Sequence, residues 1–349
     1  MVNSDKLTAM IESLRKENNI AGMSVSVTDK NKTLYLCGFG FQNSMMPDVP
    51  TYPEANYRVC SVTKMIAATT VMKLVELGKL SLDIPVKNYV PELKLSNEES
   101  LNTITIRHLL SHVSGISGIG FVDGIREESM IKSELLRTLA TIELRSLPSE
   151  NKFLYENFDF GLAGLAASSV TGEDFSALAR KYVFEPLKMT ATTFDYQVAS
   201  TYPFAMPHEV GEDGAPRVVH YHNINRVHDA AGGMYSNVGD LSRFARFLLS
   251  RGLSDTGERV LSRELFDEMT DCNVNMHDTR GGYYGLGFTA FPYGDGVIIG
   301  HNGDIPPYNS ACFADYNSGF GVALCMNTYA PKFRNELVMK ILDEVKTDV

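Results

Sequence analysis

The chain has 349 residues, of which 44% are hydrophobic and 21% are charged, a composition typical of a soluble globular protein. Its net charge of −10 argues against nucleic acid and against anionic membranes as partners. No apolar run approaches the roughly 18–20 residues that span a bilayer, and no basic segment followed by an apolar one opens the chain, so we expect neither a membrane span nor a secretory signal.

The N-terminal part of the chain predicts a helix, a hairpin and a second helix. Apolar residues at helical spacing indicate an amphipathic helix over about 5–18. Alternating residues indicate strands over 22–28 and 33–38, and the polar turn between them makes these strands a hairpin. A long, largely buried helix is expected after Ser61, ending near Gly78.

The remainder divides into a helical middle and a strand-rich end. Residues 65–190 carry mostly helical patterns interrupted by polar loops. Three strands are expected at 296–301, 310–315 and 320–326, followed by a closing helix at 333–345. Strands at both ends of the chain fit one antiparallel sheet with helices on its faces, which predicts an α+β fold.

The whole chain, 1–349, is predicted to be one domain with two lobes. An α/β lobe is expected to take about 1–64 and 225–349, and a mostly helical lobe about 65–224. Five widely spaced cysteines without a Cys-x-x-Cys pair favour reduced thiols. Together with the missing secretory signal, they predict a cytoplasmic protein, and no pattern in the sequence indicates an oligomeric state.

The stretch from Ser61 to Lys64 contains the first candidate chemistry. A serine followed three residues later by a lysine, at the start of a helix, places both side chains on one face, so the amine can reach the hydroxyl. A serine hydroxyl is a poor nucleophile until a base takes its proton. A lysine is such a base only where burial or nearby positive charge lowers its pKa. By itself, this short motif is more often an ordinary helix start.

Two further signatures follow in a set order, with Tyr-Glu-Asn at 155–157 and His-Asn-Gly at 301–303, the end of a predicted strand. Placed after Ser-x-x-Lys, this order resembles the serine β-lactamase and penicillin-binding-protein superfamily. It is most similar to the branch that contains class C β-lactamases, carboxylesterases and D-amino-acid peptidases. The similarity extends over most of the chain, through the segments 108–116, 170–172, 184–189 and 231–241.

The resemblance implies a β-lactamase/transpeptidase-like fold and catalysis through an acyl-enzyme. It implies that Ser61 is the nucleophile and that Lys64 is its base. It also implies that Tyr155 shares the base role and returns a proton to the leaving group, which requires the lysine charge to lower the pKa of the phenol. Asn157 is then expected to bond the lysine and the substrate amide.

The His-Asn-Gly motif implies the remaining parts of the site. His301 is expected to belong to the catalytic group, and Asn302 and Gly303 are expected to contact the substrate. The backbone N–H groups of Ser61 and Asp304 are expected to form the oxyanion hole, where the loss of one donor typically lowers the rate about 100-fold or more.

Two positions depart from the family pattern. Many relatives have lysine at the position of His301, and a histidine is mostly neutral at pH 7, which favours the esterase and peptidase branch over efficient β-lactam hydrolysis. Asp304 stands where many relatives have glycine, and its carboxylate favours the hypothesis of a substrate amine nearby. His222, clustered with His220 and His228 in a predicted loop, is a further candidate for substrate contact.

Other chemistry is disfavoured. Cys60 is predicted to be a small buried packing residue, because it lies outside the serine-to-lysine spacing. His108 and His112 are four residues apart, but without a His-Glu-x-x-His motif we expect no metal. No Walker loop or dinucleotide fingerprint is present, so no cofactor is expected, and the missing Gly-x-Ser-x-Gly elbow disfavours an α/β-hydrolase.

These residues together predict a serine hydrolase that acts on small esters or amides through an acyl-enzyme on Ser61. The expected partner is a small-molecule ester, amide or peptide substrate. Three alternatives stay open. One is a D-amino-acid peptidase or an acyltransferase of the same family, another is a weak β-lactamase, and the third is a catalytically silent binding protein.

Overall fold

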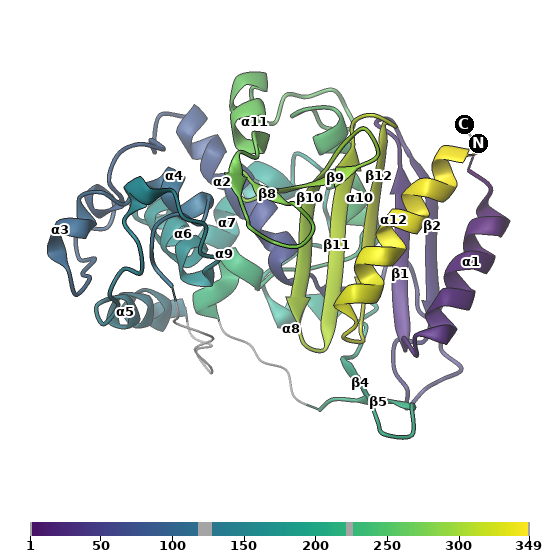
Figure 1. Ribbon diagram of the computed structural model, residues 1–349. Coiled ribbons are helices and arrows are strands. Elements are labelled where there is room, and N and C mark those ends of the chain that lie inside the picture. Colours follow the sequence, from purple (N-terminus) through teal and green to yellow (C-terminus); the bar gives the residue numbers. More distant parts are fainter. Residues whose placement is uncertain (1, 118–127, 221–225, 348–349) are drawn as a thin grey trace.

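An antiparallel sheet, eight-stranded over the described residues, runs through the protein with helices on both of its faces (Figure 1). The structure is a computed structural model that describes residues 2–117, 128–220 and 226–347. In order across the sheet, the strands are β2 (Thr33–Gly40), β1 (Gly22–Thr28), β12 (Phe320–Met326), β11 (Tyr308–Asp315), β10 (Gly296–Ile305), β9 (Thr289–Tyr293), β8 (Tyr283–Tyr284) and β7 (Val274–Asn275).

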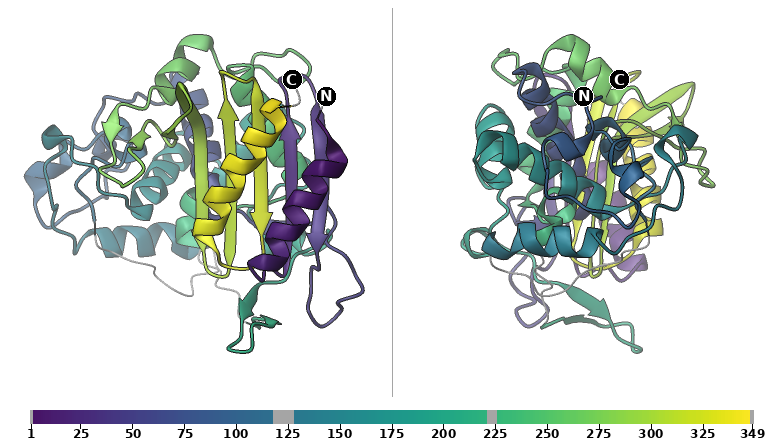
Figure 2. Two further views of the ribbon diagram at one scale, coloured as in Figure 1. Left: turned by 45° about the vertical axis from the view of Figure 1, so that its right-hand side comes forward. Right: turned by 90° about the vertical axis from the view of Figure 1, so that its left-hand side faces the viewer.

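Helices cover the two faces of the sheet in different ways. α1 (Ser4–Glu17) and α12 (Pro331–Thr347) lie side by side over one face (Figure 2). α10 (Val238–Leu249) packs on the opposite face, against β1, β11 and β12. The other α-helices are α2 (Thr63–Glu76), α3 (Glu98–Leu101), α4 (Ile106–Leu110), α5 (Glu128–Leu139), α6 (Asn157–Thr171), α7 (Phe175–Ala179), α8 (Tyr196–Ala199), α9 (Asp229–Gly232) and α11 (Arg263–Thr270).

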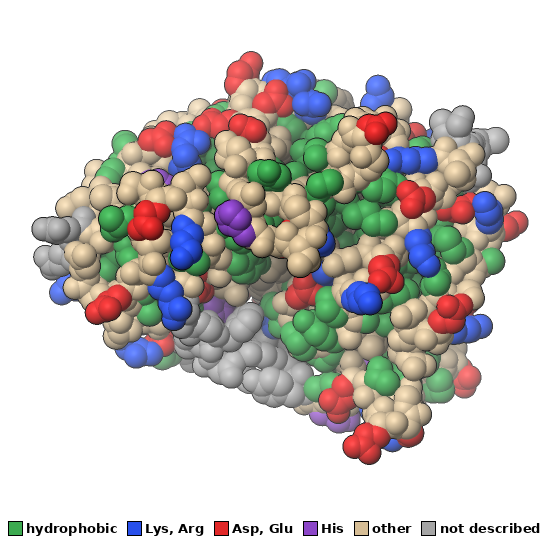
Figure 3. Space-filling model, viewed as in Figure 1, with side chains coloured by type: hydrophobic (Ala, Val, Ile, Leu, Met, Phe, Trp, Pro, Cys, Tyr) green, Lys and Arg blue, Asp and Glu red, His purple; other side chains and the backbone are tan. Residues whose placement is uncertain are grey.

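Short elements complete the chain. The strand pairs outside the main sheet are β3 (Tyr57–Arg58) with β6 (Tyr235–Ser236) and β4 (His208–Val210) with β5 (Pro216–Val218). The single-turn helices are η1 (Cys60–Val62), η2 (Val86–Asn88), η3 (Pro148–Glu150), η4 (Arg180–Phe184) and η5 (Arg226–His228). On the face shown in Figure 3, charged side chains of both signs are scattered among exposed hydrophobic ones.

The prediction of one antiparallel sheet built from both ends of the chain is confirmed, and so is the α+β class. β1 pairs with β12 from Met23↔Met326 to Thr28↔Gly321. The division into lobes at 64 and 225 stays a prediction. Within the stretch assigned to the helical lobe, β4 and β5 lie at the end of the sheet, where His208 forms a bridge to Thr328 (Figure 1).

Two features of the sheet differ from the sequence expectation. β10 continues to Ile305, so the His-Asn-Gly motif lies inside the strand and not at its end. The reason is the partner strand, because β11 pairs with β10 through Ile305↔Tyr308 and satisfies the backbone of these residues. β7, β8 and β9 were not expected, since two-residue strands are too short to show an alternating pattern, and β9 is a run of three buried residues followed by Pro292, without alternation.

The alternation in β1 separates two kinds of packing. Met23, Val25 and Val27 belong to the apolar core between the sheet and the helices α1 and α12. On the opposite face Ser24 and Ser26 are buried but satisfied, because Ser24 Oγ lies 3.0 Å from Tyr57 Oη and Ser26 Oγ donates to the Val238 carbonyl at 2.9 Å. The serine face of β1 therefore contacts Tyr57, which lies just before the turn that carries Ser61, and Val238 at the start of α10.

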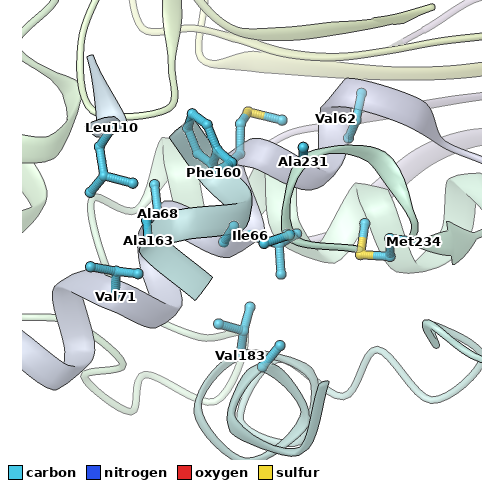
Figure 4. Packing of buried hydrophobic residues seen from close by; sticks show 14 of the residues in the cluster. Val62, Ile66, Ala68, Val71, Leu110, Phe160, Ala163, Val183, Ala231 and Met234 are labelled. Carbon is cyan, nitrogen blue, oxygen red and sulfur yellow. The ribbon is translucent and has the colours of Figure 1, made fainter. Parts of the chain in front are cut away.

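α2 forms the centre of the second core. All of its residues from Thr63 to Met72, together with Leu74, are buried, so this part of the helix is enclosed on all sides. Figure 4 shows Ile66, Ala68 and Val71 of α2 among residues of other elements, including Phe160 and Ala163 of α6. This packing fixes the helix that carries both Ser61, at its entrance, and Lys64, in its first turn.

Gly303 allows β10 to lie directly against the turn that carries Ser61. A β-carbon at Gly303 would lie 2.3 Å from the Val59 carbonyl oxygen and 2.2 Å from Ser310 Oγ. Ser310 Oγ in turn donates to that same Val59 carbonyl at 2.6 Å. The absence of a side chain at 303 thus allows the short distance between β10 and the turn that carries Ser61.

We expect Gly303→Ala to destabilise the protein by about 3 kcal/mol, the upper end of the usual overpacking range, because the clash involves backbone. Thermal unfolding and the rate of Ser61 acylation would both be measured. The double variant with Ser310→Ala removes one of the two clashes and is expected to recover only part of the loss. Unchanged values of both quantities in Gly303→Ala would contradict this account.

Candidate active site

A strained turn presents Ser61. Cys60 has φ 51°, a left-handed conformation that an L-residue adopts at a cost of about 1–2 kcal/mol. The turn is stabilised by Val59 N–H, which donates to the Met234 carbonyl at 3.0 Å, and by Thr63 Oγ1, which donates to the Cys60 carbonyl at 2.5 Å. The chain thereby passes from β3 through η1 into α2 with Ser61 facing a pocket.

Lys64 is fully buried, with its amine held by three oxygen atoms. Nζ lies 3.2 Å from Ser61 Oγ, 2.7 Å from Asn157 Oδ1 and 2.8 Å from the Ala231 carbonyl oxygen. Burial lowers the pKa of Lys64 to about 7, although the carboxylate of Glu156 acts in the opposite direction. A substantial fraction of Lys64 is therefore neutral at physiological pH.

The three partners of Lys64 determine where its lone pair points. Neutral lysine has two N–H donors, and the Asn157 and Ala231 oxygens accept both, because neither of them can donate. The lone pair is then left for Ser61, whose hydroxyl can donate its proton to Nζ. The arrangement thus makes neutral Lys64 a base aimed at Ser61.

Tyr155 contacts the same oxygen from the other side. Its hydroxyl donates to Ser61 Oγ at 2.7 Å, and Lys64 Nζ lies 4.7 Å from the centre of its ring. We expected the lysine charge to lower the pKa of this phenol, but burial raises it instead. Because 41% of Tyr155 is exposed to the open pocket, water reduces this rise in the free protein. At neutral pH Tyr155 is a proton donor.

His301 is neutral and engaged at both ring nitrogens. Burial lowers its pKa to about 3. Nδ1 donates to the Asn302 carbonyl, which leaves Nε2 as the acceptor for the Tyr284 hydroxyl at 3.0 Å. The His301 ring lies 6.3 Å from the Tyr155 ring, centre to centre. His301 therefore brings no positive charge to the position where many relatives have lysine.

The Asp304 carboxylate is already paired. Its Oδ1 accepts from Arg334 Nη1 at 2.8 Å and from Asn309 Nδ2 at 2.5 Å. Arg334 is 2% exposed and also donates to the Gly303 carbonyl at 2.9 Å. This pairing argues against the hypothesis that Asp304 attracts a substrate amine, since the carboxylate charge is compensated inside the protein.

A pocket of about 450 Å³ opens over Ser61. Its lining includes the predicted residues Ser61, Tyr155, Asn157, His301, Asn302 and Asp304, together with Met276, Arg280, Tyr284 and Phe291. Gly303, which was predicted to contact the substrate, is not among the lining residues and faces Val59 and Ser310 instead. His228 also lines the pocket, while His222 lies outside the described residues.

The sequence did not point to several residues that complete the site. Tyr284 and Arg334 are far from the motifs along the chain and carry no local signature. The Ala231 carbonyl lies in a segment that the resemblance had matched, but a backbone acceptor leaves no trace in residue type. Cys60 is fully buried, and burial raises the pKa of its thiol to about 12, as befits a packing residue.

The side chains of His108 and His112 contact different partners. His108 Nδ1 lies 3.1 Å from Thr105 Oγ1 and accepts from the Thr105 N–H, which caps α4. His112 points instead toward Asp159. In the described part of the chain, no three His, Cys, Asp or Glu side chains are grouped so that they could hold a metal ion.

Comparison with known proteins agrees with this geometry. The Beta-lactamase family matches residues 7–346, and the chain therefore belongs to this family. The chain is 24% identical over 353 residues to Protein flp of Staphylococcus aureus (strain MW2), covering 99% of this chain and 66% of that protein. The chain thus spans slightly less than two thirds of the length of that curated relative.

Solved structures show the same architecture. The octameric penicillin-binding protein homologue from Pyrococcus abyssi is 26% identical, with a TM-score of 0.79 over 98% of this chain and 78% of that chain. The D-amino acid amidase from Ochrobactrum anthropi SV3, complexed with L-phenylalanine, is 22% identical, with a TM-score of 0.82 over 99% of both chains. The expected β-lactamase/transpeptidase-like fold is confirmed.

Among residues 2–117, 128–220 and 226–347, no helix is both long enough and apolar enough to cross a membrane.

The lowered pKa of Lys64 predicts a pH dependence. The base must be neutral to accept the Ser61 proton, so the acylation rate is expected to rise through an apparent pKa of about 7 and then level off while Tyr155 stays protonated. Pre-steady-state acylation by an uncharged ester would be followed across this range. Lys64→Arg, which stays charged, is the control and is expected to remain inactive at every pH. A wild-type rate that does not change between about pH 5 and 9 would contradict the assignment.

Proposed function

We propose that this protein is a serine hydrolase that cleaves small, uncharged esters or amides through an acyl-enzyme on Ser61. The observation that carries the proposal is the meeting of Lys64 Nζ and Tyr155 Oη at Ser61 Oγ, at 3.2 Å and 2.7 Å. A base and a proton donor on one hydroxyl supply what acyl transfer requires.

The proposed reaction proceeds in two halves. Lys64 takes the Ser61 proton while Oγ bonds to the substrate carbonyl carbon. The bond from that carbon to the leaving oxygen or nitrogen then breaks, and the leaving group takes a proton from Tyr155, which is reprotonated by Lys64. Water, deprotonated by the same base, next attacks the acyl carbon, and Ser61 leaves as the protonated hydroxyl. The oxyanion hole at the Ser61 and Asp304 N–H groups stays a prediction.

The charges around the pocket support an uncharged substrate. Arg280 Nη2 lies 2.9 Å from Asp278 Oδ2, and Arg334 pairs with Asp304. His301 is neutral, and burial lowers the pKa of His228 to about 4. Among the described lining residues, each charged side chain therefore has an oppositely charged neighbour, which favours a neutral ester or amide over a β-lactam with its carboxylate.

All five cysteines are free, as expected in a reducing compartment, and we propose a cytoplasmic location, which fractionation of native cells would test.

A D-amino-acid peptidase or acyltransferase remains the second candidate, because a solved D-amino acid amidase has the same fold. Release of the acyl group to water or to an added acceptor separates the hydrolase from the transferase.

Ser61→Ala is expected to lower turnover about 1,000-fold or more without loss of folding, because the nucleophile is removed and the pocket is otherwise kept. Intact-protein mass after brief incubation with a fluorophosphonate, short acyl esters, a penicillin and D-amino-acid esters would be compared for both proteins. A single adduct on the wild type alone supports the proposal. The absence of any wild-type adduct would favour the binding-protein alternative.

The substrate class can be tested with one ester in two forms, one with a free amine and one with the amine acetylated. The Arg334–Asp304 pair predicts acylation rates that agree within about threefold, because no uncompensated carboxylate faces the substrate. Asp304→Asn should leave the ratio of the two rates unchanged. A preference for the free amine of about 10-fold or more would instead favour a D-amino-acid peptidase.

A further inference from the structure

His112 is a buried histidine that the proposed mechanism does not use. α4 ends in a Schellman arrangement, in which the Val113 N–H donates to the His108 carbonyl at 3.0 Å and the His112 N–H to the Leu109 carbonyl at 3.3 Å. His112 takes the left-handed position of this motif, with φ 58°, where glycine or asparagine is usual. A fully buried side chain in a strained conformation indicates that another interaction favours histidine here.

That interaction is with the backbone on both sides of Tyr155. The His112 carbonyl accepts from the Leu154 N–H at 2.8 Å, and His112 Nδ1 accepts from the Glu156 N–H at 3.2 Å. Between these bonds the imidazole lies against the Tyr155 ring, with ring centres 4.4 Å apart. Because Tyr155 precedes α6 in an irregular segment, no regular element fixes its position, and these contacts do so instead.

Asp159 sets the tautomer of His112. Asp159 Oδ2 lies 3.2 Å from His112 Nδ1, while Oδ1 accepts from the Ser114 hydroxyl at 2.6 Å. Burial raises the pKa of Asp159 well above its usual range and lowers that of His112. The pair is therefore neutral, with the imidazole proton on Nε2 and the single lone pair of Nδ1 shared between the Asp159 carboxylic acid and the Glu156 N–H. Nδ1 then remains an acceptor for Glu156.

Aromatic rings enclose the other sides of His112. The ring centres of Phe153, Phe160 and Tyr284 lie at 5.8, 5.2 and 5.0 Å from that of His112. Tyr284 also donates to His301, so the same enclosure extends to the pocket wall. A rigid support of this kind leaves the imidazole few alternative positions.

We propose that His112 is a positioning residue for Tyr155. It holds the backbone on both sides of this tyrosine and supports its ring, so that the phenol oxygen stays on Ser61 Oγ. The inference rests on the proposed function, since it assigns a role within the same reaction.

The test compares two replacements of His112. His112→Asn keeps an acceptor at the δ position and tolerates the left-handed backbone. His112→Leu keeps an apolar side chain of moderate size but removes the acceptor. We expect acylation by an uncharged ester, whose leaving oxygen takes the Tyr155 proton, to slow about 100-fold in His112→Leu, because a misplacement of about 1 Å has effects of this size, and to stay within about fivefold of the wild type in His112→Asn.

A double-mutant cycle with Tyr155→Phe separates positioning from general damage. If His112 acts through the Tyr155 hydroxyl, His112→Leu should lower the acylation rate of Tyr155→Phe by less than about threefold. Equal effects in both backgrounds would overturn the proposal. Val183→Ala, a buried residue of the apolar core around α2, is the control for lost stability and should slow acylation much less at a similar unfolding temperature.

The experiments distinguish a failure of the positioning role of His112 from a failure of the proposed function. Should His112→Leu not fold, His112→Gly takes its place in the cycle, because glycine relieves the left-handed strain and likewise lacks the acceptor. Wild-type protein that is labelled on Ser61, combined with additive effects at 112 and 155, rejects the positioning role alone. Wild-type protein that is never labelled rejects the proposed function, and with it the role of His112.

Discussion

The buried amine of Lys64 is the feature on which the rest of the site depends. An ammonium group taken out of water is strongly disfavoured, so burial makes the neutral form accessible near pH 7. The same burial would leave the amine unsatisfied without Asn157 and the Ala231 carbonyl, which come from α6 and α9. Three helices must therefore meet at one atom, and the apolar packing of α2 holds them there.

The second constraint is the close contact between β10 and the turn at Ser61. Gly303 has no side chain to separate them. Ser310 donates a hydrogen bond to the Val59 carbonyl, and Arg334 donates one to the Gly303 carbonyl in β10. The contact joins the C-terminal strands to a turn from early in the chain. The geometry at Ser61 consequently depends on the whole sheet, and strain at Cys60 is tolerated because both sides of the turn are fixed.

Charge compensation gives the pocket its character. Two arginines line the pocket over Ser61, yet each has a carboxylate within hydrogen-bonding distance. Burial keeps His301 and His112 uncharged, and Asp159 is held in its acid form. The hydroxyl of Ser61 thus lies beside Lys64, whose pKa of about 7 lets its amine act as a general base near neutral pH.

The sequence by itself determined the features that depend on local pattern. The spacing of Ser61 and Lys64 defined a helix start, the alternation at 22–28 defined β1, and the order of the motifs defined the family. The direction in which His301 differs from lysine was also readable, because the residue type limits its charge.

Only the tertiary structure decided how distant residues change each other's chemistry. The pKa of Tyr155 is raised and not lowered, because burial outweighs the hydrogen bond with Ser61. Asp304 is compensated by Arg334, 30 residues away along the chain. His112 lies against Tyr155 because the end of α4 packs beside the start of α6. Burial and long-range pairing arise when the chain folds, and no short stretch of residues specifies either of them.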